Sequence, residues 1–278
     1  MKRGFVRSLC VFLLLAAILT GACRDSASPV KPPEGPLVFV TPPASKGATI
    51  GVFVPSNATF LLRKSLTPGF ADVSVRFGEA GDFPLAGDWD GNGSTTVGVY
   101  RPGDTTFYLR NSNTVGNPDV VVAFGAKNDL PVVGDWDGNG TVTIGVYRPG
   151  NSTFYLRNSN TPGDADLVVA FGSKGDLPIA GDWDGDGSVT VGVYQPKTST
   201  FLLRNSNTPG DPDVRVTFGV PGDLPIVGDW DGNKTVTIGV YRPSISNFIL
   251  RNSNTKGEAD VAVTYGVPGH RPVIGKWN

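Results

Sequence analysis

The stretch Gly181-Asp182-Trp183-Asp184-Gly185-Asp186-Gly187-Ser188-Val189-Thr190-Val191-Gly192-Val193-Tyr194 joins an Asp/Gly-rich loop to an alternating apolar strand. Its first four residues recur at a constant interval of 47 residues, at Gly87, Gly134, Gly181 and Gly228, and a divergent copy begins at Gly275. A constant period in this range is typical of repeat architectures such as solenoids and propellers. The recurrence therefore decides the fold before single residues are considered.

Each repeat carries four short apolar segments. The 235 residues from Ala44 to Asn278 are five periods, and in the second copy the segments are Thr96 to Tyr100, Thr106 to Arg110, Asp119 to Phe124 and Leu130 to Gly134. Their residues alternate or are β-branched, and Gly, Pro, Asn or Asp bound each segment, which is typical of strands. Helical periodicity is absent from the repeat. The sequence predicts an all-β domain with four antiparallel strands per repeat.

Five such repeats predict a five-bladed β-propeller with one four-stranded blade per repeat. An open β-solenoid is the alternative, but its coils are usually shorter and its ends need capping sequences that are missing here. The first repeat has Val40-Thr41-Pro42-Pro43 where Gly-Asp-Trp-Asp should stand. We therefore expect the C-terminal strand Pro272–Trp277 to pair beside Thr49–Phe53, which closes the ring and removes the exposed sheet edges.

Residues 1–22 have the features of a secretory leader. Lys2, Arg3 and Arg7 form a positive start, and the apolar run from Leu9 to Leu19 is too short for a stable transmembrane helix. Without this segment the chain holds 21 basic and 25 acidic residues, a net charge of −4. A mildly acidic surface without basic runs argues against nucleic acid as a partner.

The leader ends in Leu19-Thr20-Gly21-Ala22-Cys23, which resembles a bacterial lipobox and predicts a lipid on Cys23. Because Cys10 lies inside the leader, Cys23 would be the only thiol of the mature chain. An ordinary signal peptide with an incidental cysteine is the alternative. A lipid anchor places the protein in the bacterial cell envelope, outside the cytoplasm, on the outer membrane or the cell surface.

Residues 23–43 are predicted to be a tether between the lipid and the folded domain 44–278. Their polar, Pro- and Ser-rich composition favours an extended chain. One apolar patch, Leu37–Val40, interrupts the tether and is a candidate extra strand. We expect the domain to be a monomer.

The order of motifs within the repeat resembles the FG-GAP (VCBS-like) repeat of integrin α-subunit propellers and many bacterial surface proteins. In one copy Phe124-Gly125 is followed by Gly134–Gly140 and then by Ile144–Pro149. The Phe-Gly element recurs at Phe77, Phe124, Phe171 and Phe218, and as Tyr265-Gly266. The resemblance covers all five repeats, although Gly-Val-Tyr-Arg-Pro replaces the GAP tripeptide. It implies a recognition propeller whose acidic loops join the first two strands of each blade and commonly hold calcium.

The acidic loops offer oxygen ligands of the kind that calcium prefers. The richest loop has Asp182, Asp184, Asp186, the Ser188 carbonyl and Thr190. The equivalent side chains in the other loops are Asp88, Asp90, Asn92 and Thr96; Asp135, Asp137, Asn139 and Thr143; and Asp229, Asp231, Asn233 and Thr237. The resembling family ends this pattern in Asp, where the present chain always has Thr. Two interpretations remain open: weak calcium sites, best at 182–190, or hairpin loops whose Asp and Asn side chains bind nearby backbone N–H groups.

Two further residue types recur in phase. The tryptophans could stack on sugars, but packing between blades is predicted because they alternate with core positions. A structural role, at a turn or beside a neighbouring Asp, is predicted for the arginines. These residues are Trp89, Trp136, Trp183, Trp230 and Trp277, and Arg63, Arg110, Arg157, Arg204 and Arg251.

Enzymatic chemistry has little support in the sequence. His270 is the only histidine, which leaves Ser-His-Asp, Cys-His and His-based metal sites without partners. The acidic residues repeat faithfully, whereas an active site normally breaks symmetry. We therefore predict a non-enzymatic, lipid-anchored binding or scaffold propeller that recognises a protein or glycan through its repeated loops. The alternative is a glycan-active enzyme or accessory subunit, since carboxylate-pair glycosidases occur on propellers.

Overall fold

The computed structural model describes residues 47–277. The predicted leader 1–22, Cys23, the tether 23–43 and the candidate strand Leu37–Val40 lie outside these residues. The described residues form twenty β-strands in five four-stranded antiparallel sheets. Within this range no helix is long and apolar enough to cross a membrane.

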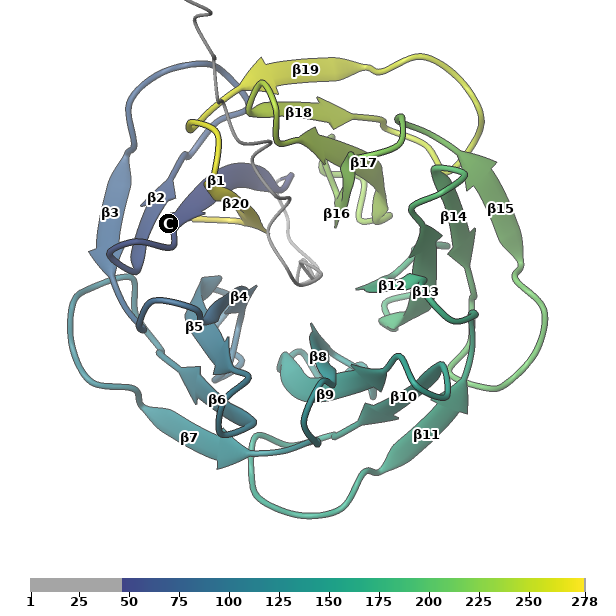
Figure 1. Cartoon of the computed structure of the whole chain (residues 1–278), viewed down its shortest axis with the longest axis horizontal. Coiled ribbons are helices and arrows are strands. Elements are labelled where there is room, and N and C mark those ends of the chain that lie inside the picture. Colours follow the sequence, from purple (N-terminus) through teal and green to yellow (C-terminus); the bar gives the residue numbers. More distant parts are fainter. Residues whose placement is uncertain (1–46, 278) are drawn as a thin grey trace, which may run out of the picture. The chain divides into compact units, whose positions relative to one another are not determined.

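The five sheets stand as blades around a common centre (Figure 1). From centre to rim, the first blade consists of β20 (Arg271–Gly275), β1 (Thr49–Val54), β2 (Thr59–Leu62) and β3 (Val73–Arg76). The other blades follow in chain order: β4 (Phe83–Gly87), β5 (Thr96–Arg101), β6 (Thr106–Leu109), β7 (Val120–Ala123); β8 (Leu130–Gly134), β9 (Thr143–Arg148), β10 (Thr153–Leu156), β11 (Leu167–Ala170); β12 (Leu177–Gly181), β13 (Thr190–Gln195), β14 (Thr200–Leu203), β15 (Val214–Thr217); β16 (Leu224–Gly228), β17 (Thr237–Arg242), β18 (Asn247–Leu250), β19 (Val261–Thr264). The predicted five-bladed propeller is confirmed.

The predicted closure is also confirmed. β20 pairs antiparallel with β1, so that Gly275 lies opposite Thr49 and Arg271 lies opposite Phe53. The same offset holds around the ring, because β4 closes the first 47-residue repeat but begins the second blade. Repeat and blade are therefore out of phase by one strand.

Local sequence explains the inner and outer strands. Every innermost strand has proline at its second position, which an edge strand tolerates because one side of its backbone lacks a sheet partner. The outermost strands alternate: in β7 the side chain of Val122 is buried and that of Val121 is 52% exposed. Edge prolines and half-exposed outer strands fit strands that lie at the two margins of each blade.

The core of each blade is built on an aromatic pair. Tyr100 of β5 lies opposite Phe107 of β6, their ring centroids are 4.7 Å apart, and both side chains are fully buried. The same pair recurs in the other blades as Phe53–Phe60, Tyr147–Phe154, Tyr194–Phe201 and Tyr241–Phe248. Tilted rings at this separation stabilise the packing beyond their buried area.

Candidate functional site

The acidic loops join the first and second strands of their blades, as the motif order predicts. In the richest loop, the Asp182 carboxylate accepts the backbone N–H groups of Gly185 (2.8 Å), Asp186 (3.1 Å) and Gly187 (2.9 Å). The loop sequence thus folds around a buried first aspartate, with glycines in left-handed conformation at Gly185 and Gly187. These bonds are the ones expected of a self-bonded hairpin loop.

The remaining two carboxylates of this loop are exposed. Asp184 accepts the N–H of Asp186 at 3.3 Å, and Asp186 accepts the N–H of Ser188 at 2.7 Å. One oxygen from each of Asp182, Asp184 and Asp186 lies within 4.8 Å of the others. In the described residues these three form a cluster with the composition of a cation site, in addition to their backbone hydrogen bonds.

Threonine at the ninth position closes the loop. The buried Thr190 hydroxyl donates to the carbonyl of Gly181 at 3.2 Å, across the pair of strands that the loop connects. Thr96, Thr143 and Thr237 make the same bond to Gly87, Gly134 and Gly228. The hydroxyl proton is therefore directed at a backbone carbonyl in all four loops, and for Thr143 the Arg157 carbonyl, at 2.7 Å, is a second and nearer acceptor.

The other three loops repeat this geometry with Asn at the third acidic position. The side chains of Asn92, Asn139 and Asn233 accept the backbone N–H two residues later, as Asp186 does. Lys234 takes the place of a glycine at φ 77°, a strained conformation for a lysine. Burial raises the pKa of the first aspartate in every loop, and the backbone N–H groups oppose that shift; these residues are Asp88, Asp135, Asp182 and Asp229.

The same loops hold neighbouring blades together. The carbonyl of Asp88 accepts the N–H of Val142 from the next blade at 2.8 Å, and equivalent bonds link Val189 to Asp135, Val236 to Asp182 and Ala48 to Asp229. The Asn160 side chain donates to Val142 O (2.9 Å) and, across the blade boundary, to Trp89 O (3.4 Å). The local sequence around Asn160 does not predict this contact between blades.

The tryptophans belong to the core. All five are only 4–6% exposed, and the ring of Trp89 lies where a Cβ on Gly87 or Gly98 would collide with it. That same Cβ on Gly87 would come within 2.8 Å of Val142 in the next blade. This supports the predicted packing between blades and leaves no ring face for a sugar.

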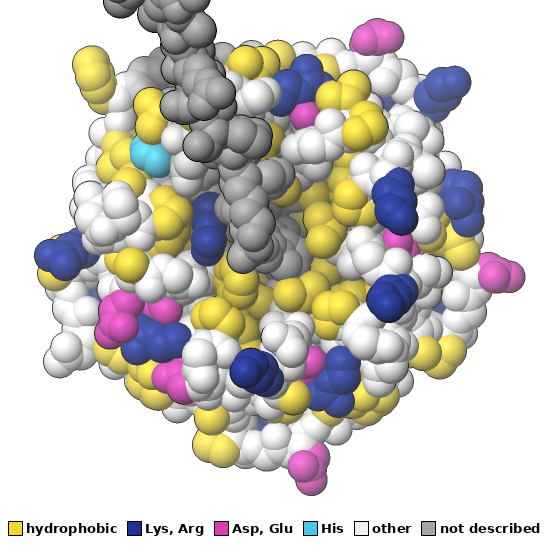
Figure 2. Space-filling model, in the orientation of Figure 1, with side chains coloured by type: hydrophobic (Ala, Val, Ile, Leu, Met, Phe, Trp, Pro, Cys, Tyr) yellow, Lys and Arg dark blue, Asp and Glu magenta, His cyan; other side chains and the backbone are white. Residues whose placement is uncertain are grey.

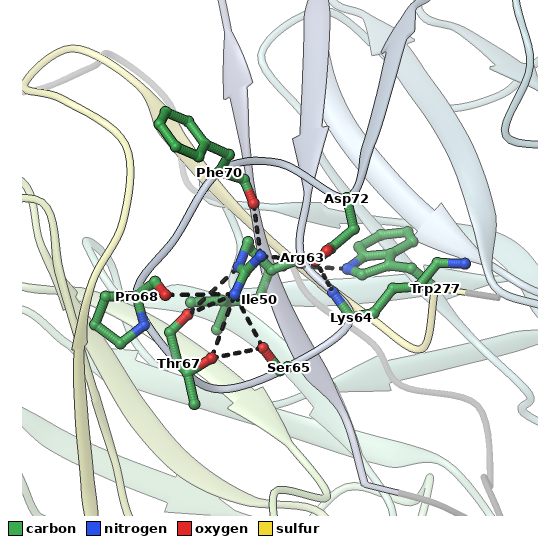
Figure 3. A network of polar contacts seen from close by, with 9 residues as sticks. All are labelled: Ile50, Arg63, Lys64, Ser65, Thr67, Pro68, Phe70, Asp72 and Trp277. Carbon is green, nitrogen blue, oxygen red and sulfur yellow. Dashed lines mark hydrogen bonds and ion pairs between the residues drawn. The ribbon is translucent and has the colours of Figure 1, made fainter.

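The recurrent arginines organise the loops between the third and fourth strands of each blade. The Arg63 guanidinium donates to Phe70 O (2.6 Å) and Thr67 O (3.1 Å) and pairs with Asp72 at 2.9 Å (Figure 3). Arg110, Arg157, Arg204 and Arg251 bind their own loops in the same way. The predicted structural role is confirmed.

A second set of charged residues lies at the opposite ends of the strands. Asp82 accepts both Nε and Nη2 of Arg101 (2.9 and 3.0 Å), and the pairs Asp129–Arg148 and Asp223–Arg242 repeat this geometry. Hydrogen bonding to Asp82 raises the pKa of the Arg101 guanidinium. On the face in Figure 2, Lys and Arg side chains are distributed around the ring, several of them beside Asp or Glu. The sequence analysis missed these pairs.

Two surface cavities lie beside these ion pairs. One, of about 370 Å³, is lined by Arg76–Glu79 of the first repeat and by Arg101, Tyr108 and Gly116–Pro118. The other, of about 360 Å³, is lined by residues that include Phe124, Arg148, Tyr155 and Gly163–Ala165. Both open between a rim strand and the face of the next blade.

The fold and these sites define a class of protein: a closed propeller of five tandem four-stranded blades with repeated loops on both faces. No protein-family model matches the chain, and no curated protein matches it in sequence.

Proposed function

We propose that this propeller is a non-enzymatic binding or scaffold protein that recognises a protein or glycan ligand through its repeated surface. A lipid on Cys23 would hold it, as a monomer, at the outside of the bacterial cell envelope. The observation that carries the proposal is the exact recurrence of self-bonded loops at both ends of the strands, which presents the same rigid groups at several positions. Rigid surfaces lose little conformational entropy on binding.

The ionisable groups of the described residues support a non-enzymatic role. The first loop aspartates accept backbone N–H groups, Asp82 and its equivalents bind arginine, and His270 Nδ1 accepts the N–H of Val267 at 3.4 Å. These bonds give each group a structural function that recurs from blade to blade. A glycan-active site would need a pair of carboxyl groups free to act as acid and as base or nucleophile.

One experiment separates binding from turnover. The full chain in mild detergent is applied to an array of glycans, and the supernatant is analysed for released sugars by mass spectrometry. Saturable binding without cleavage supports the proposal, whereas cleavage products establish the glycan-active alternative. In the same preparation, Cys23→Ser should remove the lipid mass and release the protein from the membrane fraction.

We also propose that calcium binds weakly to the loop 182–190. Asp182, Asp184 and Asp186, whose oxygens already gather in one place, would hold the ion together with the Ser188 carbonyl. A bidentate carboxylate at the end of the loop, which tight sites use, is replaced by a threonine bonded to the strand. Calcium would neutralise clustered carboxylates and stabilise the hairpin.

A further inference from the structure

The two cavities described above are one site present twice. Their lining residues are related by the 47-residue repeat: Phe77 corresponds to Phe124, Arg101 to Arg148 and Tyr108 to Tyr155. Their volumes, about 370 and 360 Å³, also agree, although Arg76 and Glu79 line only the first cavity and Asp164 lines only the second. Recurrence of the same shape on the same side chains marks a built feature of two adjacent blade boundaries.

An arginine and a tyrosine form the polar and aromatic wall of each site. The Arg101 guanidinium carbon lies 4.6 Å from the centroid of the Tyr108 ring, and in the second site Arg148 lies 4.4 Å from Tyr155. The bidentate bonds to Asp82 and Asp129 use Nε and Nη2 of each arginine. Neither bidentate pair uses Nη1, so each arginine keeps this nitrogen outside the ion pair, on a side chain that its aspartate fixes.

The tyrosine continues an apolar surface toward the rim. Strand register places Val99, Tyr108 and Val121 side by side on one face of the second blade, and Val146, Tyr155 and Val168 on the third. Val121 is 52% exposed and Val168 is 57% exposed. An aromatic ring beside an exposed valine offers apolar area to a flat ligand.

The combination is confined to these two blades. At the arginine and tyrosine positions the fourth blade has Gln195 and Leu202, the fifth has Arg242 and Ile249, and the first has Val54 and Leu61. Only blades two and three therefore pair a guanidinium with an aromatic ring at this place.

We propose that the two cavities bind neutral saccharide units, one in each, of a single oligo- or polysaccharide. This proposal rests on the recognition role proposed above, and it specifies the class of ligand and the residues that bind it. The buried Asp82 and Asp129 compensate the charges of Arg101 and Arg148. The other charged lining residues are Arg76 and Glu79 in the first cavity and Asp164 in the second, so neither cavity has a net positive charge and both favour neutral hydroxyl groups over anions. The ring and aliphatic groups would contact the apolar face of a sugar, while Nη1 donates to its hydroxyls. A cavity of this size suits a small ligand group.

Two equivalent sites on neighbouring blades give avidity. Once one unit of a repeating glycan is bound, the second binds at a high effective concentration if the glycan spans both sites. A polymer should therefore bind more tightly than its isolated unit, although each cavity makes the same contacts with a unit of the polymer as with the isolated unit.

The test uses leucine, the residue that this fold already carries at the equivalent positions Leu61 and Leu202. The variants Tyr108→Leu, Tyr155→Leu and the double variant are compared with the original chain and with Ile249→Leu, a matched control in a blade without the pair. All are probed in mild detergent with an array of neutral and acidic oligosaccharides. The best neutral oligosaccharide is then titrated by calorimetry.

We expect saturable binding of a neutral oligosaccharide to the original chain. Each single variant should lose one of the two sites. The double variant should bind at least tenfold more weakly to the oligosaccharide array. Ile249→Leu should bind as the original chain does. The melting temperature of every variant should stay within about 2 °C of the original, because leucine fits this position.

Three results would overturn the assignment: binding of no neutral oligosaccharide, neutral binding that survives in the double variant, or binding of acidic sugars alone. Binding of a glycan or protein that is unaffected by both tyrosine changes would leave the recognition role intact and place its site elsewhere. Absence of every glycan and protein ligand would count against the recognition role itself.

Discussion

Asp223 is a buried side chain that links the end of β17 to the loop before β16. Its carboxylate is 2% exposed and accepts Nε and Nη2 of Arg242 (2.8 and 2.9 Å) and the N–H of Val220 (3.0 Å). Asp176 occupies the same place in another blade, but there the partner is Gln195, at 3.4–3.5 Å. The two residues are a natural comparison of an ion pair with a weak neutral contact.

We predict that Asp223→Asn lowers the free energy of unfolding by about 1–3 kcal/mol, because it leaves Arg242 without its counter-charge. Partial exposure of Arg242 limits the loss, since water can reach the guanidinium. Asp176→Asn should cost less than about 1 kcal/mol. Urea denaturation of both variants measures the difference, and equal losses would show that the ion pair contributes nothing.

His270 takes the place of this aspartate in the closing blade, and it should make stability depend on pH. Burial lowers the pKa of its imidazole, so the unfolded chain takes up the proton first as the pH falls. The contribution of the neutral imidazole to the stability of the folded state is complete above the pKa of the unfolded chain, about 6.5. This contribution is lost as the pH falls toward the lower pKa of the folded state.

We predict that the original chain loses stability between pH 7 and pH 5 relative to His270→Asn, whose side-chain oxygen can still accept the Val267 N–H. Melting temperatures of the two proteins across this range provide the measurement. The aspartates of the acidic loops titrate in both, so their effect cancels in the comparison. Parallel curves would contradict the prediction.

At the scale of the element, close packing of Trp89 and Leu109 against Gly98 fixes β5, the second strand of its blade. A Cβ on Gly98 would lie 3.0 Å from both Trp89 Cζ2 and Leu109 Cδ2, whereas a Cβ on Gly103 would meet nothing within 4 Å. We predict a loss of about 1–3 kcal/mol for Gly98→Ala, through overpacking, and almost none for Gly103→Ala. Thermal melting and denaturant titration of both variants measure these losses. Equal stability of the two variants would show that the Trp89 ring can move aside.

The acidic loop at 182–190 supplies a prediction about calcium. With a dissociation constant of about 1 mM, 10 mM calcium should stabilise the native state by about 1.4 kcal/mol and raise the melting temperature by about 3–6 °C. Asp186→Asn should abolish the shift. Asp231→Asn, in a loop that has only two acidic side chains, should retain it. A melting temperature that does not respond to 10 mM calcium would rule out the site.

Strands and acidic loops could be predicted from the sequence because their signals are local. Alternation, bounding glycines and the recurrent Gly-Asp-Trp-Asp suffice to define them. The same recurrence was visible for Asp82 and Arg101, but their pairing depends on the register of β4 and β5, which sets Phe83 opposite Tyr100. The cavities beside Tyr108 and Tyr155 and the bond from Asn160 to Trp89 depend on how the chain crosses from one blade to the next. Period alone could not reveal them.

For the whole molecule, closure by β20 is the decisive contact. Removing residues 271–278 would expose the inner edge of β1 and delete the centre-most strand of the first blade. We predict that this truncation produces aggregated or unfolded protein, whereas in the full chain the amides of β1 exchange with deuterium as slowly as those of β9. Faster exchange confined to β1 and β20 would indicate a ring that opens locally.

The one-strand offset between repeat and blade also bears on how such a ring can change size. A gene duplication can add a whole 47-residue unit anywhere in the array. The added unit receives its inner strand from the unit before it and supplies an inner strand to the blade that follows. The two chain ends therefore still meet in a shared sheet. Blade number can therefore vary without redesigning the closure, and lineages can gain or lose binding positions in steps of one.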